Sequence, residues 1–248
     1  MFPLYDSIEN ERQPLIVIAL MLACGIVFVL TALHGGSVLD GPTATTVLGY
    51  GATPFELTHP GTVCDLSGQC FDGHGPIGTL LTIFTAMFLH GGIVHLAGNM
   101  LFLWVFGSTI EDTMNRPRFL AFYLCGGLAA TITQVVFGPN SGAPMVGASG
   151  AIAAVMGGYL VLYWRAKIRT LFLVVVVPIW FWVPAVLYLV IWFGQQALFS
   201  YADFMQPEAS GGGVAYYAHF GGFVFGVLTV HAFATRKRAV PSARWVDA

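Results

Sequence analysis

The sequence predicts an all-α, polytopic membrane protein with six transmembrane helices and both termini in the cytoplasm. Hydrophobic residues make up 56% of the 248-residue chain and charged residues only 9%, which is unlike the composition of a soluble domain. The length suits about six spans of roughly 20 residues with connecting loops. We therefore expect a single membrane domain over residues 1–248.

The expected helices follow the apolar segments in chain order. The first is long enough to cross a bilayer and is followed by no signal-peptide cleavage pattern, so it is kept as a membrane helix. The third is preceded by two arginines, the fourth begins at Ser149, the fifth contains two prolines, and the sixth ends before a basic run. The segments lie at about 14–33, 77–110, 118–137, 149–164, 171–194 and 215–234.

The ten Lys and Arg residues occupy alternate loops, as the positive-inside rule requires of a six-span topology. The other three loops, at about 34–76, 138–148 and 195–214, contain no Lys or Arg. The positive-inside rule assigns the side that carries the cations to the cytoplasm. An even number of spans places both termini on that same side. The cations are Arg12, Arg116, Arg118, Arg165, Lys167, Arg169, Arg236, Lys237, Arg238 and Arg244.

The first outer loop, at about 34–76, carries Cys64 and Cys70. Two cysteines on the non-cytoplasmic side can form a disulfide or remain free thiols. A zinc site that adds His59 and His74 is an alternative, but the spacing fits no common zinc pattern, and no metal is expected. The net charge of −2 and the lack of a long basic run predict no nucleic-acid partner.

Few polar side chains lie within the spans, and each needs a reason because a polar group in lipid is unfavourable. His95 and Asn99 share one face of the second predicted helix, whereas His90 points elsewhere. Counted from Arg165 and Arg236, Ser149 and His219 lie about 24 to 26 Å from the cytoplasmic surface. His95 lies at a similar depth, about 24 Å before Glu111 at the inner end of its helix. An interhelical hydrogen bond explains any one of these residues alone, but their common depth indicates a site.

The residues at this depth predict hydrolysis. A serine hydroxyl needs an adjacent base, and an imidazole suits this task near neutral pH, so Ser149 is the predicted nucleophile and His219 the predicted base. His95 and Asn99, with the backbone N–H of Ser149, are predicted to bind the oxyanion. No Asp or Glu lies at this depth, so a Ser–His dyad is expected. Glycines that allow the helices to approach closely are Gly147, Gly150, Gly222 and Gly226.

These residues resemble the rhomboid family of intramembrane serine proteases. The resemblance rests on His90-x4-His95-x3-Asn99, on Gly107-x3-Glu111, on Gly147-Ala148-Ser149-Gly150, and on Ala218-His219 followed by Gly221 or Gly222 and then Gly226. The motifs occur in the family's order. They cover a rhomboid-like core at about 77–234, which follows a first helix at about 14–33 and the long outer loop.

The resemblance implies a rhomboid-like bundle in which Ser149 and His219 form the dyad and His90 holds the first outer loop. It also implies a serine endopeptidase, without a cofactor, that cleaves single-span membrane proteins near the outer end of their helix after a small residue. Two features depart from the family. The outer loop lacks the frequent Trp-Arg pair, and Ala153 stands where relatives often carry an aromatic residue that stacks on the base.

Access to the site is predicted through a lateral gate between the second and fifth helices. Pro178 and Pro184 are expected to bend the fifth helix. Large aromatic side chains on this helix are expected either to pack in the gate or to face lipid or the membrane interface. They are Trp180, Phe181, Trp182 and Trp192.

Other functions fit the sequence less well. The chain has no H-E-x-x-H zinc motif and no pair of intramembrane Asp residues for an aspartyl protease. A small transporter would continue a polar path below Asn99, and a non-catalytic rhomboid-like chaperone would lack Ser149 or His219. The expected partners are transmembrane substrates and the lipid bilayer. The absence of a targeting extension predicts a multi-pass protein of a bacterial inner or plasma membrane, and the sequence indicates neither a natural substrate nor an oligomeric state.

Overall fold

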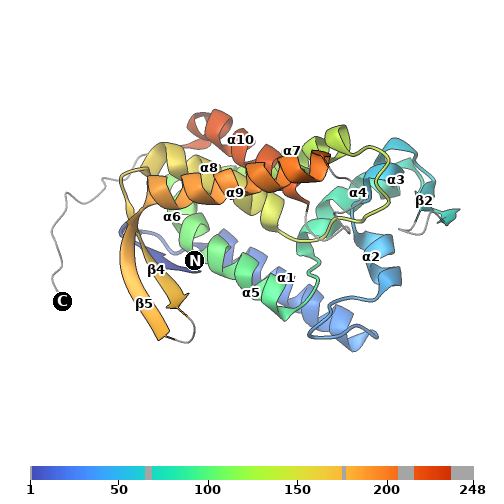
Figure 1. Ribbon diagram of the computed structural model, residues 1–248, viewed down its shortest axis with the longest axis horizontal. Helices are drawn as coiled ribbons and strands as arrows, with labels where there is room; N and C mark the ends of the chain where they lie inside the picture. Colours follow the sequence, from blue (N-terminus) through green and yellow to red (C-terminus); the bar gives the residue numbers. More distant parts are fainter. Residues whose placement is uncertain (1, 65–68, 175–176, 206–214, 236–248) are drawn as a thin grey trace.

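A computed structural model describes residues 2–64, 69–174, 177–205 and 215–235, and it is mostly helical (Figure 1). Within this part of the chain, four helical segments are long and apolar enough to cross a membrane: Leu15–Leu33, Ile93–Thr113, Arg116–Phe137 and Ala185–Ala202. Four of the cations that were predicted to face the cytoplasm lie outside the described residues, at positions 236–238 and 244. The long helices are α1 (Leu15–Leu33), α7 (Arg116–Phe137), α8 (Ser149–Tyr163), α9 (Ala185–Met205) and α10 (Tyr216–Phe233).

The predicted helix at 77–110 is interrupted, so its prediction as one continuous helix was wrong. Gly92 has a φ of 130°, which favours glycine, and a Cβ there would collide with the carbonyl oxygen of Leu39. Ile93 N donates to Val38 O at 2.9 Å, which fixes the outer loop against the restarted helix. The pieces are α4 (Pro76–Thr85), the 3-10 turn η1 (Ala86–Phe88), α5 (Ile93–Phe102), the π-helical turn η2 (Leu103–Gly107) and α6 (Ser108–Thr113).

The predicted fifth helix is also corrected, because its first half forms a β-hairpin. Strands β4 (Lys167–Val174) and β5 (Val177–Pro184) pair antiparallel, and β1 (Phe2–Asp6) joins β4 in a sheet of order β1-β4-β5. The run is rich in β-branched and aromatic residues, which favour strands. β5 is an edge strand, where proline is tolerated. The fold is therefore not purely α-helical.

This correction removes the argument for a kinked gate helix. Pro178 and Pro184 lie in β5, together with the predicted gate residues Trp180, Phe181 and Trp182, whereas Trp192 lies in α9. α9 does contact the second predicted span, since the rings of Phe102 and Tyr188 have centroids 6.4 Å apart. A lateral gate between α5 and α9 stays a prediction, but a proline kink in the gate helix is no longer part of it.

The first outer loop contains short elements that pack at the end of the bundle opposite the hairpin (Figure 1). The structure joins Cys64 to Cys70 by a disulfide between two paired strands. His74 donates its backbone N–H to the buried Glu56 carboxylate at 2.8 Å, and His59 stacks on Phe55. In the part of the chain that the structure describes, no three His, Cys, Asp or Glu side chains lie together as a metal site, and His59, His74 and the two cysteines form none. The elements are α2 (Ala44–Tyr50), α3 (Pro54–Thr58), β2 (Thr62–Cys64) and β3 (Cys70–Asp72).

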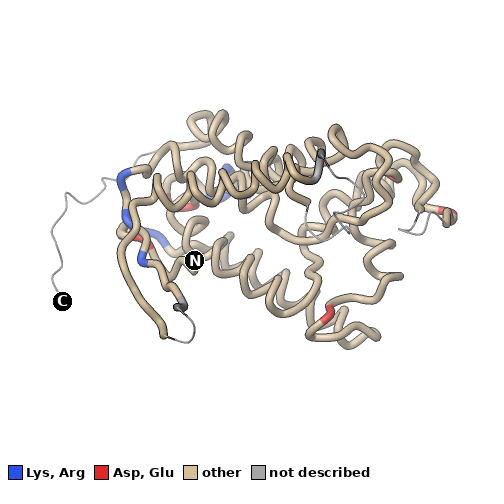
Figure 2. The backbone as a smooth tube through the Cα atoms, viewed as in Figure 1, with Lys and Arg blue, Asp and Glu red and all other residues tan. Residues whose placement is uncertain are grey.

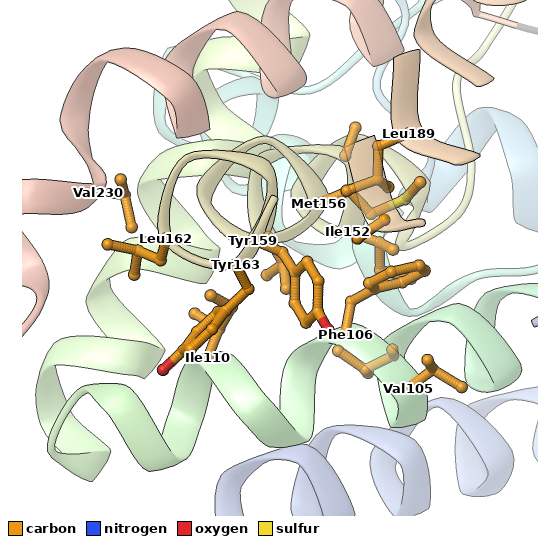
Figure 3. Packing of buried hydrophobic residues seen from close by; sticks show 14 of the residues in the cluster. Val105, Phe106, Ile110, Ile152, Met156, Tyr159, Leu162, Tyr163, Leu189 and Val230 are labelled. Atoms are coloured by element: carbon orange, nitrogen blue, oxygen red, sulfur yellow. The ribbon is translucent and has the colours of Figure 1, made fainter. Parts of the chain in front are cut away.

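α8 lies at the centre of the core and packs against α7 and α10 (Figure 3). Tyr159 of α8 is fully buried, and its ring meets that of Phe106 edge to face with centroids 5.1 Å apart. α10 approaches α8 so closely that a Cβ on Gly222 or Gly226 would collide with a carbonyl oxygen of α8. This close packing of glycine sets the distance between the first turns of the two helices.

Candidate active site

Ser149 and His219 are brought into contact by α8 and α10. Ser149 is the first residue of α8, and His219 lies in the first turn of α10. Ser149 Oγ is 2.7 Å from His219 Nε2, which is hydrogen-bond distance. Both side chains are half-buried, so the pair can be reached from outside the core. The geometry is that of a nucleophile beside a base.

Gln196 fixes the imidazole of His219 from the other side. Gln196 is buried in α9, and its Oε1 atom lies 2.8 Å from His219 Nδ1. An amide oxygen only accepts, so Nδ1 carries the proton and Nε2 is left free to accept from the serine hydroxyl. Sequence reasoning missed Gln196 because the predicted fifth helix ended at residue 194. A glutamine inside an apolar helix was the available signal.

Trp192 lies beside the ring of His219 as well. It precedes Gln196 by one helical turn, and its ring centroid is 6.0 Å from that of His219, with 40° between the planes. Ala153 is fully buried in α8 and provides no ring. The aromatic neighbour of the base, left open by the sequence, thus comes from α9 in this chain.

His95 and Asn99 lie on one face of α5 and point toward the segment before Ser149. A Cβ on Gly147 would be 2.8 Å from His95 Nε2 and 3.4 Å from Asn99 Nδ2, and Gly147 has a φ of 121°. The Gly91 backbone N–H donates to His95 Nδ1 at 3.2 Å, so the neutral ring carries its proton on Nε2. Asn99 Nδ2 is buried and has no hydrogen-bond partner among the described residues. Two donors therefore meet beside Gly147, two residues before Ser149.

His90 precedes α5 and is fully buried. Its Nδ1 is 3.2 Å from Phe88 O, and its ring meets that of His95 with centroids 5.3 Å apart. His90 Nε2 has no partner in the described part of the chain. The contact with the first outer loop is instead made by the backbone beside it, where Val38 O accepts from Ile93 N.

A small cavity of about 40 Å³ lies beside Ser149. This volume holds one or a few water molecules. Small and apolar residues from the outer loop, α4, η1, α7, α8 and α10 form most of its wall. The lining residues are Ala52, Ile83, Ala86, Met87, Gly127, Ala130, Thr131, Met145, Val146, Gly147, Ser149, Gly150, Ala151, Ala215 and Ala218.

Comparison with known protein families identifies the family of this chain. The model of the Rhomboid domain matches residues 78–236, which is more than half of the chain. The chain belongs to the rhomboid family. All of the predicted site residues from His90 to Gly226 lie inside the matched rhomboid domain, whereas α1 and the two disulfide cysteines precede it.

Three curated rhomboid proteins illustrate the similarity. The chain is 41% identical over 91 residues to Rhomboid protease GluP of Bacillus subtilis, covering 37% of this chain and 17% of that protein. It is 35% identical over 98 residues to Presenilin-associated rhomboid-like protein A, mitochondrial, of Danio rerio, covering 39% and 26%. It is 30% identical over 152 residues to Rhomboid protein 1, mitochondrial, of Saccharomyces cerevisiae, covering 60% and 40%. The chain spans less than half the length of each relative.

Proposed function

We propose that this rhomboid protein is an intramembrane serine endopeptidase that cleaves single-span membrane proteins near the outer end of their helix. The observation that carries the proposal is the 2.7 Å contact between Ser149 Oγ and His219 Nε2. The hydrogen bond from His219 Nδ1 to Gln196 supports it, because it leaves Nε2 as the basic nitrogen. A chaperone that only binds helices has no use for such a pair.

In the proposed reaction, Ser149 Oγ attacks the carbonyl carbon of the scissile peptide while His219 Nε2 takes the hydroxyl proton. His95 Nε2–H and Asn99 Nδ2–H stabilise the oxyanion of the tetrahedral intermediate. The imidazolium then gives its proton to the leaving amine, and the C–N bond breaks to leave an acyl-serine. His219 next takes a proton from water as the water oxygen attacks the ester carbon. The imidazolium then returns this proton to Ser149 Oγ as the ester C–O bond breaks, which releases the new carboxyl end and restores the dyad.

The cavity beside Ser149 supports cleavage after a small residue. Gly127, Ala130, Gly150 and Ala218 contribute to its wall, and its volume of about 40 Å³ does not admit a large side chain. The substrate helix must also unwind near the cleavage site, because an intact helix hydrogen-bonds the carbonyl that the serine attacks. Small residues near the outer end of a span suit both requirements.

A six-span topology with both termini in the cytoplasm is part of the proposal. The spans are α1, the α5–α6 segment, α7, α8, α9 and α10, of which α8 has 15 residues and α10 has 18. The shorter α8 is almost wholly enclosed by protein, which removes the need to match the bilayer thickness. The described Lys and Arg residues gather at one end of the bundle (Figure 2), in support of a cytoplasmic end.

The proposed location is a cell membrane, with the protein embedded as a multi-pass chain. The Cys64–Cys70 disulfide lies at the end of the bundle opposite the cations. Disulfides persist in oxidising compartments, which supports an outer loop that faces away from the cytoplasm. Transmembrane substrates and bilayer lipids are the proposed partners.

Labelling with a fluorophosphonate tests the proposed nucleophile directly. The reagent phosphonylates a serine that an adjacent base activates, so mass spectrometry of the membrane-embedded protein should find the adduct on Ser149. Ser141, in the loop before α8, is an internal control for non-specific reaction. His219→Ala should greatly slow labelling. Equal labelling of both serines, or of wild type and His219→Ala, would argue against an activated serine.

A further inference from the structure

The β4–β5 hairpin exposes an unusual amount of apolar surface. It leaves the helical bundle at the end that carries β1 and runs beyond the helices (Figure 1). In β5, Ile179 is 44% exposed and Trp180 is 50% exposed, and Phe181 and Trp182 are also exposed. Successive side chains of a strand point to opposite faces, so both faces of the hairpin are apolar. A strand that faces water alternates apolar and polar residues instead.

The base of the hairpin is anchored in the protein core. Ile168 and Val183 are cross-strand partners, and both are buried in the main hydrophobic cluster. Farther out, the rings of Phe172 and Phe181 stack with centroids 4.7 Å apart. The hairpin is therefore held at its base and presents its distal aromatic residues away from the bundle.

Cations contact aromatic rings at the base of the hairpin and just before it. Arg169 is the cross-strand partner of Trp182, and its guanidinium lies 5.7 Å from the indole centroid. Tyr5 of β1 meets the same indole edge to face, with centroids 5.5 Å apart. Arg165 lies 4.4 Å from the ring centroid of Trp164, which is exposed just before β4. Trp and Tyr rings next to Arg side chains are typical of a membrane–water boundary.

The position of the hairpin agrees with such a boundary. β5 ends at Pro184, and Ala185 begins α9, which is long and apolar enough to span a membrane. The hairpin therefore lies at the level where a span begins. The described cations gather at this same end (Figure 2), and anionic lipids on the cytoplasmic leaflet attract such clusters.

We propose that the β4–β5 hairpin lies in the headgroup region of the cytoplasmic leaflet as an anchor for anionic phospholipid. The side chains of Ile179, Trp180 and Phe181 insert among the lipids, and Arg165 and Arg169 contact the lipid phosphates. Insertion removes the apolar faces from water. The headgroup region also supplies polar partners to the outer backbone edge of β5, which pairs with no further strand among the described residues.

Fluorescence quenching in nanodiscs tests the anchor. In the full-length protein, with Cys24 and Cys125 replaced by Ala, an environment-sensitive fluorophore is attached to Ile179→Cys. A matched control carries it on Asn10→Cys, an exposed polar position near the same end. In nanodiscs that contain phosphatidylglycerol, lipid-borne nitroxide should quench the label at residue 179 and iodide should not. The label at residue 10 should show the reverse.

Two outcomes would overturn the proposal. If iodide quenches residue 179 as strongly as residue 10, the hairpin stands in water. If neither reagent quenches residue 179, protein covers it, and pairing of two β5 edges between copies of the chain becomes the explanation. A crosslink between two chains through Ile179→Cys would then be observed.

The lipid charge is tested by Arg165→Gln and Arg169→Gln together. In phosphatidylglycerol nanodiscs this variant should lose part of the protection of residue 179 from iodide, whereas in phosphatidylcholine alone it should match the unsubstituted protein. If the double variant protected residue 179 from iodide as well as the unsubstituted protein in both lipids, the role of anionic headgroups would be contradicted. Fluorophosphonate labelling of Ser149 should be unchanged throughout, so failure of the anchor is distinct from failure of the proposed protease activity.

Discussion

His219 is held by the side-chain amide of Gln196, whose Oε1 atom lies 2.8 Å from the Nδ1 atom of the imidazole. This bond selects the tautomer in which Nε2 faces Ser149. A neutral amide orients the ring but brings no negative charge to balance the imidazolium that forms during the reaction. We therefore assign Gln196 a positioning role.

Gln196→Ala should lower kcat and leave KM for a membrane substrate nearly unchanged. Loss of one hydrogen bond of this kind is worth about 1 to 3 kcal/mol, or roughly 5- to 150-fold in rate. Gln196→Glu should recover part of the rate because its carboxylate also accepts from Nδ1. Steady-state kinetics in proteoliposomes distinguishes the cases. A fully active Gln196→Ala enzyme, or a change in KM alone, would contradict a positioning role.

The two oxyanion donors should affect kcat more than binding. Removal of one such donor typically lowers the rate by about 10² to 10³, so Asn99→Ala should leave slow, measurable turnover. His95→Ala should have a similar or larger effect because it also removes the acceptor of the Gly91 N–H. Asn140→Ala, in the loop before the site, is the control and should be near wild type. An Asn99→Ala variant that raises KM without lowering kcat would place Asn99 in substrate binding instead.

Gly226→Ala should impair both stability and catalysis. The added methyl would collide with the carbonyl oxygen of Ala154 and force α10 away from α8. Overpacking of this kind destabilises proteins by about 1 to 3 kcal/mol, and separation of the helices lengthens the contact between Ser149 and His219. Gly25→Ala in α1 is the matched control, since nothing lies within 4 Å of its new methyl. Thermal unfolding and turnover, measured together, check both effects. Equal behaviour of the two variants would contradict the close-packing account.

Asp6 should make the stability of the protein depend on pH. Burial raises the pKa of Asp6 above its ordinary value, although Tyr159, Thr109 and the Ile8 N–H all donate to its carboxylate. A raised folded-state pKa means that the contribution of this group is present below its unfolded-state pKa of about 3.9 and is lost as the pH rises through the folded-state value.

Asp6→Asn removes this titration. The free energy of unfolding of wild type minus that of Asp6→Asn should therefore fall as the pH rises from about 4, and should level off once Asp6 is ionised in both states. Reversible unfolding in mixed micelles gives both curves. A difference that grows with pH would show that the fold prefers the carboxylate.

Four of the predicted helices lie close to their observed positions because long apolar runs with cationic or glycine boundaries have one favourable structure in a membrane. The contact between Ser149 and His219 was also predictable, since depth along each helix follows from the rise per residue. The β4–β5 hairpin, in contrast, was not predictable from the sequence. A run such as 171–184 is apolar in every position, so periodicity does not distinguish a strand from a helix.

The role of Gln196 depended on that same segment. Once 171–184 is taken as helix, α9 is predicted to end too early and Gln196 falls into a loop. The break in the second predicted helix at Gly91 and Gly92 was also not evident from the sequence, because glycine is common in membrane helices. The need for glycine at position 92 comes from its positive φ and from its close approach to Leu39, which only the folded chain shows. Tertiary contacts, rather than local preference, decide these features.

Cleavage of a purified single-span substrate by Ser149→Ala, in proteoliposomes, tests the central proposal most directly. Ser149→Ala should abolish cleavage, and His219→Ala should come close to the same loss. The double variant should be no worse than Ser149→Ala, because members of one catalytic unit are not additive. Cleavage by Ser149→Ala at a rate comparable to wild type would contradict the serine protease mechanism.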